Sequence, residues 1–122
     1  MAEIEKIEKI EPIRLTDNET GKVYELDFSR ESVKFVENQG FKIEETFEFP
    51  NVNIPKLFYY AFRKNHKNVS LDQTDKLLDK MGGLTEKIAI RLVDLYRQAT
   101  VSNNIIQEQE DLEKNSRVTV EL

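Results

Sequence analysis

A stretch of ten residues concentrates aromatic and basic side chains in a way that raises the question of chemistry. The stretch "LFYYAFRKNH", residues 57–66, places four aromatic rings beside Arg63, Lys64 and His66, and His66 is the only histidine of the chain. Aromatic rings on a basic surface stack on nucleic-acid bases, and a histidine beside a suitable partner acts as an acid or base. A core helix whose last turn is basic is the third interpretation.

The spacing of the apolar residues favours the core helix. Residues separated by three or four positions lie on one face of a helix, and this pattern holds for Ile54, Leu57, Phe58, Ala61 and Phe62. We therefore expect a helix that begins near Ile54, with Pro55 in its first turn. Phe58 and Phe62 then point into the core, while Tyr59 and Tyr60 lie on the two shoulders of the helix.

Catalytic and metal-binding interpretations find little support. No GxSxG or HExxH spacing supplies His66 with a nucleophile or a metal partner, so a surface or helix-capping role is the simpler interpretation. Asp72, Asp75 and Asp79 share one side of a predicted helix, but Lys76 and Lys80 lie beside them. This pattern is typical of a solvated salt-bridge face, with Asp72 and Lys76 as an i, i+4 pair. We expect no enzyme, no metal site and no cofactor.

Charge weighs against nucleic acid as a partner. Between residues 56 and 67 the sequence has four cations and no acid, namely Lys56, Arg63, Lys64 and Lys67. The whole chain of 122 residues nevertheless carries a formal net charge of -5, which opposes association with nucleic acid or an anionic membrane. A regulatory protein that binds nucleic acid through these four cations is kept as a minor alternative.

The pattern of the remaining segments predicts a small α+β fold. Residues 12–28 alternate in polarity around turn formers, which predicts an antiparallel hairpin. Helices are expected between Ser29 and Gly40, between a Ser70–Gln73 capping box and Gly82, and after Thr85. Residues 41–49 are left open as a strand or an extended loop. The short sheet, with or without a C-terminal strand, is expected to be packed with three to four helices.

We divide the chain into four parts. Residues 1–11 are expected to form a flexible extension, residues 12–101 a single α+β domain and residues 102–116 a mobile polar linker. Residues 117–122, "RVTVEL", alternate and predict a C-terminal strand. The chain has no cysteine, and it lacks both a signal-peptide pattern and an apolar run long enough to span a bilayer. We expect a soluble protein of the cytoplasm, without a membrane partner.

Surplus apolar residues predict a surface for another protein. In the last helix the apolar arc extends beyond the core-facing stripe through Ala89 and Val93, while Ile90 falls on the other side. An exposed apolar patch of this kind marks a protein-binding site. The candidate partner-binding residues are Tyr59, Tyr60, Ile90 and Val93.

Several stretches also carry a resemblance to a known family. They are "LTDNETGKVYELDFSRESVKFVENQGFKIEE", "IPKLFYYAFRKNHKNVS", "GGLTEKIAIRLVDLY" and "VTVEL", which together extend from about Ile13 to Leu122. The sequence resembles the small tail assembly chaperones of long-tailed bacteriophages and prophages of Gram-positive bacteria. The most distinctive pieces are "ESVKF" with "GF", and "FYYAFR".

The resemblance implies a protein that acts by binding, without catalysis. Such chaperones bind the helical tape measure protein, keep it soluble and help the tail tube protein to assemble around it. The resemblance also implies several copies along one client, a location in the bacterial cytoplasm and absence from the finished virion. A permanent structural protein of the tail or the head-tail junction is the main alternative.

Overall fold

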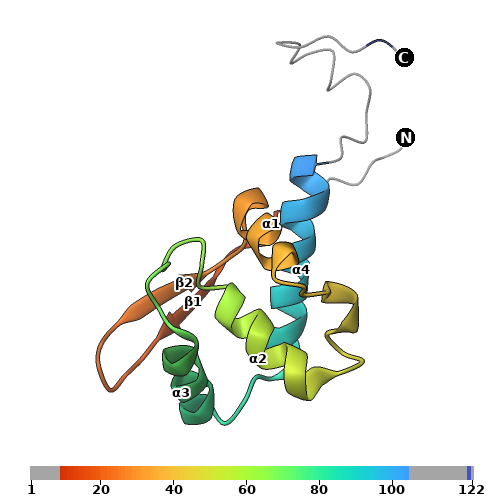
Figure 1. Cartoon of the computed structure of the whole chain (residues 1–122). Coiled ribbons are helices and arrows are strands. Elements are labelled where there is room, and N and C mark those ends of the chain that lie inside the picture. The colour runs from red at the N-terminus through yellow and green to blue at the C-terminus, as the bar shows by residue number, and fades with distance from the viewer. Residues whose placement is uncertain (1–8, 105–120, 122) are drawn as a thin grey trace.

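The computed structural model describes residues 9–104 and Glu121. Along the chain, the strands β1 (Ile13–Thr16) and β2 (Val23–Leu26) are followed by helix α1 (Arg30–Asn38) and a single 3-10 turn (Ile43–Glu45). Three longer elements complete the order: α2 (Pro50–Tyr60), α3 (Leu71–Met81) and α4 (Glu86–Asn104). The two-stranded antiparallel sheet and four helices confirm the small α+β fold (Figure 1).

The hairpin forms where the alternation predicts it. Ile13 lies opposite Leu26 and Leu15 opposite Tyr24, so their side chains share the face that packs on the core. Arg14 lies opposite Glu25 on the other face. Gly21 adopts a φ of 78° in the turn, a backbone conformation that glycine takes without steric cost.

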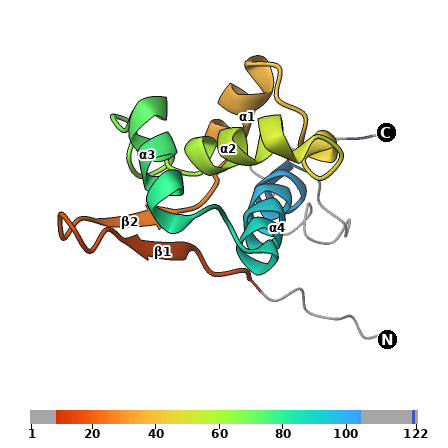
Figure 2. The same cartoon turned by 90° about the horizontal axis from the view of Figure 1, so that it is seen from below.

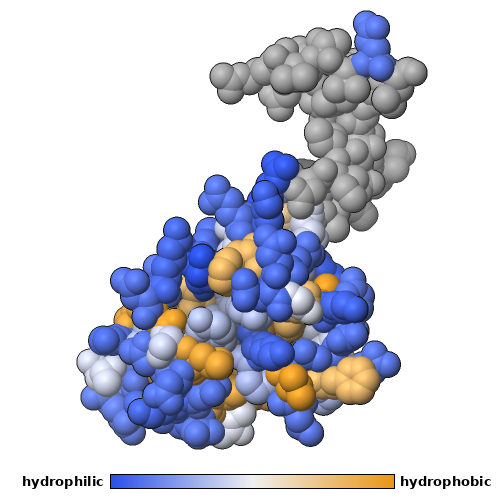
Figure 3. Space-filling view, in the orientation of Figure 1, coloured by the Kyte–Doolittle hydropathy of each residue, from blue (hydrophilic) through white to orange (hydrophobic). Residues whose placement is uncertain are grey.

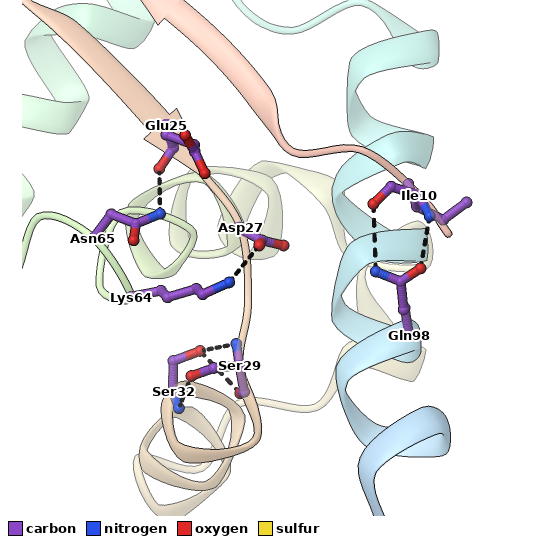
Figure 4. A network of polar contacts seen from close by, with 8 residues as sticks. All are labelled: Ile10, Glu25, Asp27, Ser29, Ser32, Lys64, Asn65 and Gln98. Carbon is purple, nitrogen blue, oxygen red and sulfur yellow. Dashed lines mark hydrogen bonds and ion pairs between the residues drawn. The ribbon is translucent and has the colours of Figure 1, made fainter. Parts of the chain in front are cut away.

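The outer edge of β2 is covered by the turn that follows α2. The amide of Asp27 donates to the carbonyl of Ala61 at 3.1 Å, and the Asp27 carboxylate accepts from the Lys64 ammonium at 2.6 Å (Figure 4). The Asn65 side chain donates to the Glu25 carbonyl at 3.2 Å. These contacts satisfy backbone groups that the edge of a two-stranded sheet would otherwise leave unpaired.

The helices close one core beside the hairpin. α4 packs against α1 and α2, and α3 packs against α2. In Figure 2, α1, α2 and α3 lie above the hairpin and α4 lies beside its end. The largest fully buried side chains come from β2, the helices and the turns between them, and include Leu26, Leu57, Phe58, Phe62, Leu92, Leu95 and Tyr96. Ser29 caps α1 and Ser70 caps α3 through capping boxes, and Thr85 accepts a hydrogen bond from the Ile88 amide. The expected helix signals are confirmed.

The expected start of the second helix is wrong. α2 begins at Pro50, not near Ile54, and Pro55 lies inside the helix. Proline suits a first helical turn, and here it is Pro50 that occupies this position. The segment 41–49, for which the sequence allows a strand or an extended loop, holds the 3-10 turn and no strand.

The predicted outer segments are only partly within the described residues. α4 includes residues 102–104, which the sequence assigns to the linker, and residues 105–116 lie outside the described part. Of the predicted strand 117–122, only Glu121 is described, and it is exposed and belongs to no strand. Ile10, from the predicted extension, exchanges two hydrogen bonds with the Gln98 side chain of α4 (Figure 4).

The tip of the hairpin is tied to α3 by a small ion cluster. The Lys80 ammonium lies 2.9 Å from the Asp17 carboxylate and 3.0 Å from that of Glu19. The hydrogen bond from Lys80 lowers the pKa of Asp17 below its ordinary value, and the amide of Glu19 adds to this effect. Because the pKa is depressed in the folded state, the cluster stabilises the fold above pH ~4 and loses that contribution as the pH falls further.

We therefore predict that Lys80→Met raises the pKa of Asp17 toward its unperturbed value. The same substitution should make unfolding in acid less dependent on pH below ~4, since the folded and unfolded carboxyls then titrate alike. An NMR titration of the Asp17 carboxyl carbon measures the shift. Lys76→Met, which removes only the Asp72 partner on α3, is the control and should leave the titration of Asp17 unchanged. A normal pKa for Asp17 in the wild type would contradict the cluster.

Candidate protein-binding surface

The segment from Thr46 to Asn53 has its polarity reversed relative to a normal surface segment. Thr46 is 0% exposed and Asn53 is 8% exposed, whereas Phe47 and Phe49 are each 55% exposed and Val52 is 57% exposed. Surface segments usually turn their apolar side chains toward the core. Here two polar side chains, those of Thr46 and Asn53, face inward, and three large apolar side chains face solvent. We call Phe47, Phe49 and Val52 the apolar patch.

Hydrogen bonds hold the segment in this orientation. The Thr46 hydroxyl donates to the Ile43 carbonyl at 2.7 Å, and the Asn53 side-chain amide donates to the Glu45 carbonyl at 3.1 Å. The amide of Phe49 also bonds to Glu45, and that of Asn53 bonds to Phe49. Since the buried polar groups are satisfied, the patch is fixed by the backbone and is not an accident of loose packing.

The patch lies at the beginning of α2. Figure 3 shows apolar side chains at the lower right of the molecule, where Figure 1 places the start of this helix. Phe49 and Val52 are three residues apart, which places them on one side of the first helical turn. Glu44 and Glu48 are exposed beside them. An apolar surface with an acidic rim therefore faces solvent at this end of the helix.

The residues expected from sequence to bind a partner are distributed differently. Tyr59 and Tyr60 are half-buried, and their rings lie 5.3 Å apart between centroids, with Tyr60 also against Phe41 at 5.5 Å. Burial raises the pKa of the Tyr60 hydroxyl. Ile90 is 45% exposed, as expected.

Val93 does not contribute exposed apolar surface. It is 5% exposed, and Ala89 is buried to the same degree. The expectation that these two residues extend the apolar arc beyond the core is wrong, because α1 and α2 both pack against α4 and cover a wider arc than one stripe.

His66 completes the edge of the sheet. Its Nε2 accepts a hydrogen bond from the Glu25 amide at 2.9 Å, and its ring packs edge-on against Tyr24 and Phe62. The ring borders a hollow of about 10 Å³ on the side of Phe35 and Arg63, which has room for one water, and an open hollow of about 490 Å³ on the side of Val23 and Tyr24. Through its bond to the Glu25 amide the imidazole acts as a backbone-capping group.

Two of the four cations expected for a nucleic-acid surface have partners within the chain. Lys64 forms the ion pair with Asp27, and the Arg63 guanidinium lies 3.5 Å above the centroid of the Phe35 ring. Lys56 and Lys67 are exposed. Among the described residues, no three His, Asp or Glu side chains are grouped so as to hold a metal ion. The predicted pair between Asp72 and Lys76 forms at 3.2 Å.

Comparison with known proteins shows a family match that covers the whole length of the chain. A family model described as a domain of unknown function, DUF5055, matches residues 1–122, and the chain belongs to this family. No curated protein and no solved structure matches the chain. No helix in the described part of the chain is long and apolar enough to cross a membrane.

We predict that His66→Phe destabilises the domain by about 1 kcal/mol, because the ring contacts are retained while the Glu25 amide loses its acceptor. Chemical denaturation measures the free energy of unfolding, and hydrogen exchange at the Glu25 amide should become faster. An unchanged exchange rate at Glu25 would show that the amide does not depend on the imidazole.

Ile90 and Val93 give a second prediction. Val93→Asp should cost about 4 kcal/mol or more, because it buries an unpaired charge in the core. Ile90→Asp, on the same helix, should change stability by no more than about 0.5 kcal/mol, because the side chain reaches solvent. Thermal unfolding of the two variants measures the difference, and equal losses would contradict the assignment of the two side chains.

Proposed function

We propose that this protein is a tail assembly chaperone, and that the apolar patch at the start of α2 binds helical segments of a phage tape measure protein. The observation that carries the proposal is the reversed polarity of residues 46–53, which holds three large apolar side chains in solvent. Such exposure lowers the solubility of a free protein. Exposed apolar side chains are an advantage for a protein whose task is to cover the apolar surface of another protein.

The chemistry of the patch suits an amphipathic helix as client. Two phenylalanines and a valine within six residues offer a short, broad apolar contact, which fits side chains that repeat every three or four positions along a helix. Glu48 lies between the two phenylalanines and, with Glu44, would meet basic residues that flank the client's apolar stripe. The net charge of -5 keeps the loaded chaperone soluble. On this proposal the protein acts without catalysis in the bacterial cytoplasm and also aids assembly of the tail tube protein.

A nucleic-acid-binding regulator is the weaker candidate. The intramolecular partners of Arg63 and Lys64 leave a smaller basic surface than the sequence suggests. A permanent structural protein of the tail or the head-tail junction would use the same apolar patch. That alternative differs in one respect that an experiment can measure, because the protein would be found in purified virions.

We predict that Phe47→Asp combined with Phe49→Asp prevents this protein from keeping a co-expressed tape measure protein soluble. The fold should survive, because both side chains are exposed. Phe49 is the N-cap residue of α2 and makes no side-chain cap hydrogen bond, so aspartate at this position is favourable for the helix. The free energy of unfolding should therefore not fall, while the fraction of soluble tape measure protein does.

The matched control is Leu71→Asp, which removes an exposed apolar side chain from the start of α3. It should leave the client soluble. If the double variant retains full chaperone activity, the patch is not the client site. If the wild type forms no complex with the tape measure protein but is present in finished particles, the protein is a structural component.

A further inference from the structure

The hairpin has one covered edge and one open edge. On β2, the Glu25 amide and carbonyl point away from β1 and bond to His66 and Asn65. Because Arg14 lies opposite Glu25 in the antiparallel register, its own amide and carbonyl point away from β2. The same holds for Thr16, two residues further on. No described residue bonds to these four groups, and β1 forms the outer margin of the sheet in Figure 2.

The C-terminal segment carries the pattern that this edge requires. β1 reads Ile-Arg-Leu-Thr and pairs with Val-Tyr-Glu-Leu of β2. Residues 119–122 read Thr-Val-Glu-Leu, which has the same Glu-Leu ending and the same alternation. An antiparallel pairing that places Glu121 opposite Arg14 also places Val120 opposite Leu15, Leu122 opposite Ile13 and Thr119 opposite Thr16. Apolar residues then face apolar residues on one side, and a charge pair and a threonine pair lie on the other.

A hollow lies beside the open edge. It has a volume of about 240 Å³ and lies between the hairpin and α3, with Leu15, Leu77 and Met81 on its walls beside the ion cluster of Asp17, Glu19 and Lys80. In the proposed register, Val120 lies opposite Leu15 and Val118 opposite Asp17. Both valines are thus directed to the side of the sheet on which the hollow opens.

We propose that the C-terminal segment of one copy of this protein adds to the open edge of β1 in a second copy, in the register that pairs Glu121 with Arg14. In the single chain, Glu121 is exposed and belongs to no strand, and no described residue bonds to the outward backbone groups of β1. A second copy would supply a strand for the edge of β1 and an edge for the C-terminal segment. Reciprocal exchange gives a closed dimer, and exchange in one direction gives a chain of copies. The proposal does not depend on the client of the apolar patch.

The absence of cysteine allows a direct test. Thr16→Cys and Thr119→Cys are made as two separate variants and mixed, so that a mixed disulfide forms only between two molecules. Thr16 and Thr119 would form a hydrogen-bonded pair with Cα atoms about 5.5 Å apart, which a disulfide spans. The mixed disulfide, measured by mass spectrometry after mild oxidation, should exceed that from Thr16→Cys mixed with Asn115→Cys by about tenfold.

Sedimentation of cysteine-free protein completes the test. The wild type should self-associate, and Thr119→Pro should sediment as a monomer, because proline removes an amide of the added strand. Equal disulfide yields for Thr119→Cys and Asn115→Cys would overturn the proposal. So would a doubly substituted Thr16→Cys, Thr119→Cys protein that closes its disulfide within one molecule, since the segment would then occupy the edge of its own chain. Neither result bears on whether the patch binds a client.

Discussion

The fold depends on how the two-stranded sheet of the described residues is supported. An isolated hairpin is at best marginally stable in water, and here the missing support comes from the turn after α2. That turn presents the Ala61 carbonyl, the Lys64 ammonium, the Asn65 amide and the His66 imidazole to one edge of β2. The last turn of α2 is thereby held against the sheet. The C-terminal end of α2 therefore lies at the sheet, and its N-terminal end, at Pro50, carries the apolar patch.

This anchoring explains why "LFYYAFRKNH" looks like a functional site in the sequence. The aromatic residues of the stretch pack the core or its margin, and the basic residues meet backbone and acidic groups of β2 or the Phe35 ring. A surface that binds nucleic acid has the same composition, because it also needs aromatic rings beside positively charged side chains. What distinguishes the two interpretations is the partner of each group, and these partners lie 28 to 41 positions away in the chain.

Local signals predicted most of the fold, and long-range contacts account for what they missed. The capping serines, the positive-φ glycines and the alternating hairpin act within a few residues, so the sequence alone was sufficient for them. The start of α2 is predicted too late because Pro55 suits a first helical turn, whereas the helix begins at Pro50 and the buried Asn53 bonds across to Glu45. The burial of Val93 likewise depends on neighbouring helices that periodicity within α4 does not reveal. For the patch, the reading of "TFEFP" as an alternating strand or loop hid a segment whose apolar side chains are turned outward.

The patch and the open edge serve different contacts because the fold keeps them apart. The start of α2 lies at the right of the molecule and the hairpin extends to the left, and this separation is the same in both orientations of the ribbon (Figures 1 and 2). A copy that receives a strand on β1 therefore keeps its patch accessible. Association of copies through the sheet would set several patches along one assembly, and each patch alone is small. Binding at several linked sites raises the overall affinity without any new contact, so under both proposals a surface of three exposed apolar side chains would suffice to hold a long helical client.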